Sequence, residues 1–229
     1  MGAVSLKKKP DMIFLPGSKN TMGDLRWMRQ NGLEAAVKKL AAHIPVWGIC
    51  GGYQMLGRTI SDPHGVENEN LLREPLRGME LIDTDTTLMP EKMRTQTRGK
   101  FENVTGIFST LSGLEFSGYE IHMGKTTVST GEHQTPLVQL ADGRTDGVQR
   151  MEKGSEEPGV YGSYVHGIFD DGDIAVRIVQ ALADKKRVSW KPEAGGDYHA
   201  FKEQQYDKLA QGLREHLDME YVYSILQES

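Results

Sequence analysis

The feature that most constrains the fold is a short apolar run that ends in a glycine-flanked cysteine. Residues 46–49 form the run, Cys50 follows it, and Gly51 and Gly52 come directly after the cysteine. An apolar run of this kind, bounded by a proline and by paired glycines, indicates a buried strand that ends in a sharp turn. Residues 53–56 have helical character, so the pattern predicts a strand, a turn and a helix in succession.

A similar unit lies upstream. Residues 12–15 are apolar and run into a Pro-Gly-Ser turn, which indicates a first buried strand. Thr21 or Asp24 is expected to cap the helix that follows, and apolar residues at helical spacing predict a second helix over residues 33–43. Strands separated by helices open an α/β sheet, in which functional sites lie at the carboxyl ends of the strands.

The middle of the chain has a different character. Residues 61–146 are rich in threonine, glycine and short alternating stretches, which predict an additional β-rich segment. The strands expected there are residues 78–84, 99–105, 119–127 and 136–140. The charged stretch at residues 71–98 is expected to run over the surface.

Strand and helix signals return in the last third. Residues 160–165 predict a strand that ends at His166, and Asp173 is expected to cap the next helix. Residues 198–226 predict a long amphipathic helix, with Gly212 as the point where it would break. Its apolar face is expected to pack on the core or, as the alternative, on a further domain.

Bulk composition limits the function classes. The chain has 229 residues, a net charge of −5 and a single cysteine. The acidic balance argues against nucleic acid as a partner, and no stretch reaches the roughly 18 apolar residues of a membrane span. One cysteine excludes an intrachain disulfide and points to a reducing compartment such as the cytoplasm, or to chemistry.

Cys50 is the candidate nucleophile. In the pattern Gly48-x-Cys50-x-Gly52, the glycines allow a tight turn that exposes the cysteine side chain above the sheet. The helix start beyond it is expected to lower the thiol pKa, and the Gly51 N–H can face an oxyanion. The alternative is an inert buried cysteine, which would not need the surrounding glycines.

A cysteine nucleophile needs a base, and His166 is the best candidate. It follows a predicted strand, so it is expected at the same sheet edge as Cys50. His122 is the second candidate, in a segment interpreted as a wall of the substrate pocket. No zinc-ligand spacing and no Walker-type phosphate loop is present, so we expect no metal and no ATP site of that type.

These motifs together resemble a known family. The stretch Gly48-Ile49-Cys50-Gly51-Gly52-Tyr53-Gln54 resembles the nucleophile motif of class I (triad-type) glutamine amidotransferases, most closely the C-terminal domain of the cobyric acid synthase branch. Further matching motifs occur in the family's order at residues 15–21, 62–67, 118–124 and 165–170. The resemblance implies a flavodoxin-like fold, a mostly parallel central sheet flanked by helices, with residues 1–10 as a leader or the edge of an expressed chain and residues 11–229 as one domain.

The resemblance also implies roles for individual residues. Cys50 would attack the glutamine carboxamide to form a thioester, and His166 would carry the proton to the departing ammonia. The backbone of Gly51, with that of Gly17 or Ser18, would hold the oxyanion. The residues that would contact glutamine are Gln54, Tyr119 and His122.

One position departs from most class I enzymes. A glutamate usually stands two residues after the histidine, where this chain has Ile168. The cobyric acid synthase branch also lacks that glutamate. The carboxylates that could orient His166 instead are Glu120, Asp170 and Asp171.

The resemblance implies partners as well. Glutamine would be the substrate, and an N-terminal ATP-binding synthetase domain, with its ATP and magnesium, would use the ammonia to amidate a corrinoid acceptor, adenosylcobyrinic acid a,c-diamide, in cobalamin biosynthesis. No cofactor is expected in this domain. The alternatives are an amidotransferase subunit of a complex that amidates lipid II, a non-catalytic binding module on the same fold, and another cysteine hydrolase such as a peptidase.

Overall fold

The structure of the chain is a computed structural model that describes residues 9–67, 74–129, 133–151, 159–170, 172–192 and 198–227. The expected leader, residues 1–10, therefore falls outside the described residues except for its last two positions.

Three parallel strands form the part of the sheet that carries the candidate nucleophile. They are β1 (Ile13–Leu15), β2 (Val46–Ile49) and β9 (Val160–Ser163). β2 lies in the middle, where Gly48 pairs with Leu15 on one side and Gly162 on the other. All three strands therefore end at one edge, as the sequence predicts for an α/β sheet.

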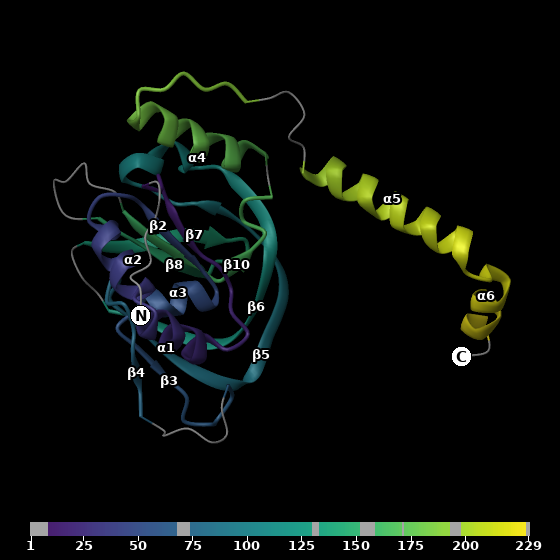
Figure 1. Cartoon of the computed structure of the whole chain (residues 1–229), viewed down its shortest axis with the longest axis horizontal. Helices are drawn as coiled ribbons and strands as arrows, with labels where there is room; N and C mark the ends of the chain where they lie inside the picture. Colours follow the sequence, from purple (N-terminus) through teal and green to yellow (C-terminus); the bar gives the residue numbers. More distant parts are fainter. Residues whose placement is uncertain are drawn as a thin grey trace.

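Helices cover both faces of this sheet (Figure 1). One face carries α1 (Thr21–Gln30), α2 (Leu33–Ala41) and α3 (Gly51–Leu56), and the other carries the short helix η1 (Gly106–Leu111) and α4 (Gly172–Lys185). Because successive strand residues point to opposite faces, Val46 lies in one apolar core and Trp47 in the other. The α/β class predicted from the sequence is confirmed.

The cap of α1 differs from the expectation. Asn20 caps the helix, and its side-chain oxygen accepts a hydrogen bond from the Gly23 N–H at 3.0 Å. Thr21 is the first helical residue and Asp24 lies in the first turn, so neither is the cap.

The β-rich segment extends the same sheet. Its strands are β3 (Thr59–Ser61), β4 (Leu76–Arg77), β5 (Thr84–Phe101), β6 (Glu115–Val128), β7 (Gln134–Leu140), β8 (Thr145–Arg150) and β10 (Val165–His166). Most of these strands pair antiparallel, so the sheet is parallel around the candidate site and mixed as a whole. The expected strands over residues 119–127 and 136–140 are confirmed within β6 and β7.

Three expectations for this segment are wrong in whole or in part. The expected strand over residues 99–105 is a strand only as far as Phe101, where β5 ends. Residues 84–98 belong to one long strand, β5. Its residues 90–96 lie at the surface as expected, whereas Thr84, Thr86 and Leu88 are buried. Residues 78–83 are irregular rather than a strand, because the fully buried Met79 and Ile82 fold back under α3. The Met79 N–H donates to the Met55 carbonyl at 2.8 Å, which fixes this turn against α3.

β5 and β6 pair as a long antiparallel ribbon with one irregularity. Leu88 is opposite Gly124 and Met93 is opposite His122, so β5 advances five residues where β6 advances two. β5 bulges here, and the regular ladder is interrupted beside His122.

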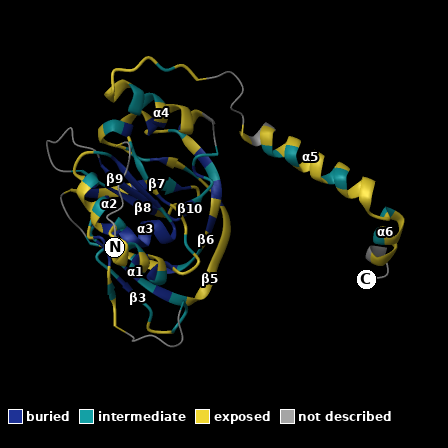
Figure 2. Ribbon diagram, viewed as in Figure 1, coloured by how far each residue is buried: buried dark blue, intermediate teal, exposed yellow. Residues whose placement is uncertain are grey.

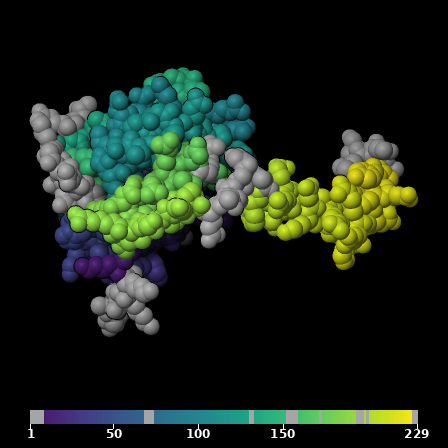
Figure 3. Space-filling model, turned by 90° about the horizontal axis from the view of Figure 1, so that it is seen from above, coloured from purple at the N-terminus to yellow at the C-terminus, as the bar shows by residue number. Residues whose placement is uncertain are grey.

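The C-terminal helices α5 (Tyr198–His216) and α6 (Met219–Gln227) stand away from the sheet (Figures 1 and 3). α5 continues through Gly212, and the break falls at residues 217–218. Tyr221 is 65% exposed, and Figure 2 shows exposed and half-buried residues along both helices. The expected packing of this face on the core is therefore wrong.

Candidate active site

Cys50 occupies the sharp turn between β2 and α3. Its backbone has φ of 52° and ψ of −111°, a region that residues with a Cβ rarely adopt. A Cβ at Gly52 would lie 2.0 Å from the Leu15 carbonyl oxygen, and one at Gly48 would lie 2.7 Å from the Gly52 carbonyl oxygen. Only glycine fits at these two positions, so the predicted strand-turn-helix elbow is present.

His166 comes to the same place from β10. A Cβ built on Gly17 would lie 3.1 Å from His166 Cε1 and 3.7 Å from Cys50 Cβ. The turn after β1 therefore lies beside both side chains. The structure brings together Cys50, His166 and Gly17, which are far apart in the sequence.

The two backbone segments predicted to hold an oxyanion are adjacent. A Cβ on Gly51 would lie 2.8 Å from the Ser18 backbone nitrogen and 3.0 Å from Thr21 Oγ1. The N–H groups of Gly51 and Ser18 are thus near neighbours beside Cys50. Donors fixed in this way can stabilise negative charge on an oxygen between them.

Burial governs the protonation of both candidate reacting groups. It raises the pKa of the Cys50 thiol above 9.0, and the Gly51 N–H only partly opposes this. The expectation of a lowered thiol pKa is wrong, because desolvation by burial is the largest effect on the thiol. Burial also lowers the pKa of His166, so burial disfavours the charged form of both groups.

The Ile121 carbonyl lies beside both groups. Cys50 Sγ donates to this carbonyl oxygen at 3.6 Å. A hydrogen bond with the backbone of Ile121 partly restores the pKa of His166. His166 Nε2 is buried and has no hydrogen-bond partner among the described residues, so it is available to accept a proton.

A cavity of about 290 Å³ opens in front of Cys50. This volume is at the small end of the roughly 300–1,000 Å³ of ligand pockets and suits a single small metabolite. Three charged side chains line it, namely Lys19, Glu67 and Lys92. Ser18, Gln54 and His122 also line the cavity.

Gln54 is held firmly in the cavity wall. Its Oε1 accepts from Thr21 Oγ1 at 3.2 Å, and its Nε2 donates to the Tyr164 hydroxyl at 3.2 Å. Both polar atoms thus already have partners. Contact between Gln54 and glutamine remains a prediction.

The other two residues expected to contact glutamine lie differently. His122 borders the cavity, with Nδ1 at 2.9 Å from the Gly124 carbonyl oxygen and its ring stacked on Tyr164 at 3.8 Å. Tyr119 is half-exposed and is not among the residues that line the cavity. Its role in binding stays a prediction that this geometry does not support.

None of the described carboxylates proposed to orient His166 is bonded to it. Glu120 is engaged by Arg144 at 2.6 and 3.2 Å, and Asp170 accepts from Lys202 at 3.1 Å. Asp171 lies outside the described residues. Ile168, at the position of the usual glutamate, is fully buried in an apolar core.

Glu67 and Lys92 are site residues that the sequence interpretation missed. Glu67 accepts hydrogen bonds from the backbone N–H groups of Thr21 and Met22, each at 2.8 Å, and its charge raises the pKa of Cys50. The charge of Lys92 lowers the same pKa. The motif at residues 62–67 is a signal for Glu67, but only the fold shows that it reaches α1.

Among the described residues, no group of three or more His, Cys, Asp or Glu side chains is placed to hold a metal ion. No helix in the described part of the chain is both long and apolar enough to cross a bilayer.

Comparison with known proteins identifies the family. Residues 2–174 match the CobB/CobQ-like glutamine amidotransferase domain. The chain belongs to this family. As a CobB/CobQ-like amidotransferase domain, it is 47% identical to a cobyric acid synthase of Ruminiclostridium cellulolyticum over 96% of its own length and 42% of the relative. It is 39% identical to the cobyric acid synthase of Lachnoclostridium phytofermentans over 98% of the chain and 44% of that relative.

A solved structure agrees with the fold. The structure of PurLQS from Thermotoga maritima has a TM-score of 0.51 and 16% identity, and the match covers 81% of this chain and 84% of the other. The likeness supports the α/β fold. The CobB/CobQ-like domain spans less than half the length of the curated relatives that it matches.

Proposed function

We propose that this amidotransferase domain hydrolyses glutamine through a thioester on Cys50. The Sγ atom would attack the carboxamide carbon while His166 accepts the thiol proton. The C–N bond would then break, and His166 would return the proton to the leaving nitrogen, which departs as ammonia. Water would cleave the γ-glutamyl thioester to release glutamate and restore the thiol.

One observation carries this proposal. Cys50 sits on a strained turn and His166 reaches the same place, since a Cβ built on Gly17 would lie within 4 Å of both side chains. Strained backbone persists where the surroundings enforce it, commonly at functional sites. The neighbouring N–H groups of Gly51 and Ser18 would stabilise the oxyanion.

The charges in the cavity fit the two ends of a zwitterionic amino acid. Glu67 would face the α-ammonium group of glutamine, while Lys92 or Lys19 would face the α-carboxylate. These charges lie in the same cavity as the Cys50 sulfur, so they can orient the carboxamide toward it. Gln54 and His122 would complete the walls, with Tyr119 outside them.

The ammonia would serve a partner. The curated relatives are cobyric acid synthases of more than twice the matched length, which supports a synthetase part outside this chain. That part would bind ATP and magnesium and would amidate a corrinoid acid, adenosylcobyrinic acid a,c-diamide, in cobalamin biosynthesis. The same names favour this acceptor over lipid II.

The first test measures glutamate release from glutamine. The wild-type chain is expected to release glutamate, and Cys50→Ala is expected to release none, because the variant has no nucleophile. Release by both proteins would contradict the proposal. Gly212→Ala, in the projecting helix α5, is the matched control and should behave as wild type.

If the wild-type chain releases no glutamate, a second measurement is needed. A glutamine-like electrophile is expected to form one covalent adduct on Cys50, and free glutamine should slow this reaction. Labelling that glutamine protects would show a formed site that needs its partner for turnover. Labelling without protection, or no labelling, would favour the non-catalytic alternative.

A further inference from the structure

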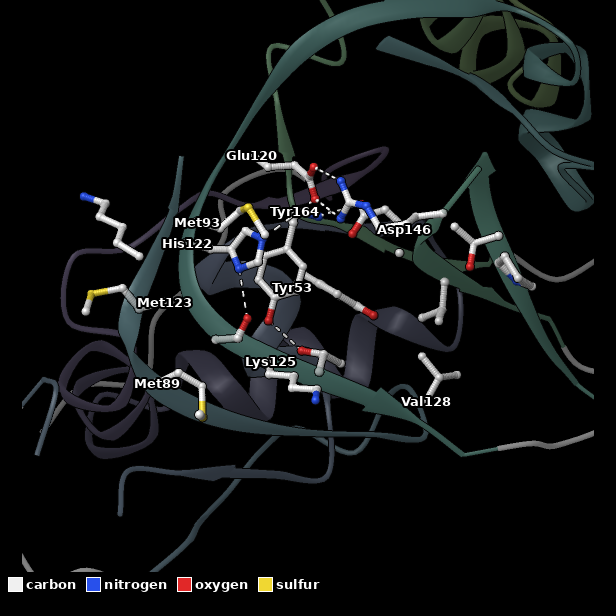
Figure 4. A pocket seen from close by; sticks show the side chains of 18 of the residues that line it. Tyr53, Met89, Met93, Glu120, His122, Met123, Lys125, Val128, Asp146 and Tyr164 are labelled. Carbon is white, nitrogen blue, oxygen red and sulfur yellow. Dashed lines mark hydrogen bonds and ion pairs between the residues drawn. The ribbon is translucent and has the colours of Figure 1, made fainter. Parts of the chain in front are cut away.

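Glu67 is the one carboxylate among the described residues that line the catalytic cavity. A larger cavity of about 640 Å³ adjoins it, and His122 lines both (Figure 4). The buried carboxylates of the larger cavity are already engaged. Arg144 binds Glu120, and Asp146 accepts hydrogen bonds from a hydroxyl and a backbone N–H at 2.6 and 2.9 Å. A cationic group in the catalytic cavity would therefore meet Glu67.

The segment that carries Glu67 begins with a turn that its sequence specifies. Residues 62–65 read Asp-Pro-His-Gly, and aspartate, proline and glycine at the first, second and fourth places are typical of a type I turn. The Gly65 N–H donates to the Asp62 carbonyl at 3.5 Å. Gly65 has φ of 68°, which favours glycine. The chain therefore reverses direction directly before Val66 and Glu67.

Asp62 holds the two residues that follow the turn. Its Oδ1 accepts from the Val66 N–H at 2.7 Å, and its Oδ2 accepts from the Glu67 N–H at 3.0 Å. Hydrogen bonds to a carboxylate are stronger than those between neutral groups, and two of them fix orientation as well as distance. Asp62 is not among the residues that line the catalytic cavity. It therefore acts on a ligand through Glu67 rather than by contact.

The side chain of Glu67 is fixed by helix α1. The backbone N–H groups of Thr21 and Met22 donate to its two carboxylate oxygens, each at 2.8 Å. These N–H groups belong to the first turn of α1, where no partner exists within the helix. A carboxylate has about four acceptor positions, so two remain for a ligand. Glu67 thus lies in the cavity wall with a fixed orientation and with the capacity to bind an ammonium group.

We propose that Asp62 is a positioning residue that makes the catalytic cavity specific for a ligand with an α-ammonium group. Asp62 holds the backbone of Glu67 so that the carboxylate reaches both α1 and the cavity. A carboxylate that is fixed in advance binds an ammonium group without the cost of ordering a flexible side chain. The proposal rests on the proposed function, in which Glu67 faces the α-ammonium group of glutamine.

The first test compares glutamine with glutaramate, which has the same carboxamide and carboxylate but no amino group. The measured quantity is kcat/KM for glutamine divided by kcat/KM for glutaramate. Asp62→Ala is expected to lower this ratio by roughly tenfold, chiefly through a higher KM for glutamine. A disturbance of the oxyanion donors would slow both substrates and would cancel in the ratio.

Matched variants show whether Asp62 acts through Glu67. Asp62→Asn keeps one acceptor oxygen and should lower the ratio less than Asp62→Ala. Glu67→Gln should lower the ratio by itself, and adding Asp62→Ala to it should have little further effect, because the two residues act as one unit. Asp218→Ala is the control, since Asp218 accepts from the Tyr221 N–H at 3.0 Å in the projecting helices and should not affect the ratio.

The second test needs no substrate. Hydrogen exchange of the Thr21 and Met22 backbone N–H groups, followed by nuclear magnetic resonance, reports whether the Glu67 carboxylate still accepts from them. Exchange at both positions is expected to be at least about threefold faster in Asp62→Ala, because the acceptor is no longer held in place. Asp218→Ala should leave both exchange rates unchanged.

The outcomes separate this proposal from the proposed function. Unchanged exchange at Thr21 and Met22 in folded Asp62→Ala would overturn the positioning role, whether or not the wild-type chain releases glutamate. With an active wild type, the specificity role is overturned by a wild-type ratio near one, by an unchanged ratio in Asp62→Ala, or by an equal fall when Glu67→Gln is already present. If Asp62→Ala does not fold, Asp62→Asn decides both measurements.

A wild-type chain without turnover is tested by protection of Cys50. Glutamine is expected to slow the labelling of Cys50 by a glutamine-like electrophile more strongly than glutaramate does, and Asp62→Ala should reduce this difference. Equal protection by the two compounds would overturn the specificity role. Protection by neither would count against the proposed function, and the exchange rates of Thr21 and Met22 would then decide the role of Asp62.

Discussion

At the scale of single residues, Gly17 lies beside both reacting side chains. A methyl group there would meet His166 Cε1 at 3.1 Å, closer than most carbon contacts. The backbone of Gly17 is not in the left-handed region, so alanine brings crowding without backbone strain. The added methyl group is therefore expected to displace the His166 imidazole rather than to destabilise the fold.

We therefore expect Gly17→Ala to lower kcat for glutamine hydrolysis by roughly tenfold while changing the free energy of unfolding by less than about 1 kcal/mol. Steady-state kinetics and denaturant titration check the two parts. Gly212→Ala, with no atom within 4 Å of the new methyl group, is the control. An active Gly17→Ala enzyme would mean that His166 has room to move.

The thiol of Cys50 makes a pH prediction at the same scale. Because burial raises its pKa above 9.0, alkylation of the free chain by iodoacetamide should be slow near about pH 7 and should rise with a midpoint above pH 9.0. The chain has one cysteine, so the labelled site is unambiguous. A rate that is already maximal below about pH 8 would contradict this and would indicate a thiolate–imidazolium pair.

Linkage gives a second check on the same group. The pKa of the Cys50 thiol is higher in the folded chain than in the unfolded chain. Its contribution to the free energy of unfolding is therefore fully present below the unfolded-state pKa. That contribution is lost as the pH rises through the folded-state pKa. The melting temperature of wild type should therefore fall relative to that of Cys50→Ala above about pH 9.

At the scale of elements, local patterns predict some segments well and others not at all. The strand at residues 46–49 and the elbow at Cys50 follow from an apolar run and adjacent glycines, which act locally. β8 (Thr145–Arg150) carries no such signal, and its position depends on pairing with β7 and β9. The sequence pattern does not predict the long strand β5, because the exposed middle of that strand is charged.

The same division applies to the site. Cys50 and His166 were identified because their motifs end predicted strands. The positions of Lys92 and Arg144 depend on the ribbon of β5 and β6 and on the turn before β8, which bring residues distant in sequence together. The direction of the pKa shift of Cys50 also could not be predicted from the sequence, because it depends mainly on burial in the folded chain.

At the scale of the whole molecule, the sheet and its helices form one body from which α5 and α6 project (Figure 1). Among the described residues, Lys202 of α5 forms an ion pair with Asp170 of the body at 3.1 Å, between partly exposed side chains. Ion pairs of this kind add little to stability. The body should thus be stable without these helices.

A chain that ends at Pro192 is expected to fold with a melting temperature within about 3 °C of the full chain and to keep Cys50 reactivity. Circular dichroism and thermal unfolding measure the first part, and labelling by a glutamine-like electrophile measures the second. Cooperative loss of the sheet on truncation would show instead that α5 or α6 packs on the body in solution.

The strained turn at Cys50 has a consequence for descent. Glycine would adopt φ of 52° with no crowded Cβ, so Cys50→Gly is expected to be more stable than either wild type or Cys50→Ala. The protein thus keeps a cysteine at this position although glycine is expected to give a more stable fold. In a homologue no longer under selection for catalysis, substitution of this cysteine by glycine would be favoured by stability. The residue at this one position would then distinguish an active homologue from an inactive one in a genome.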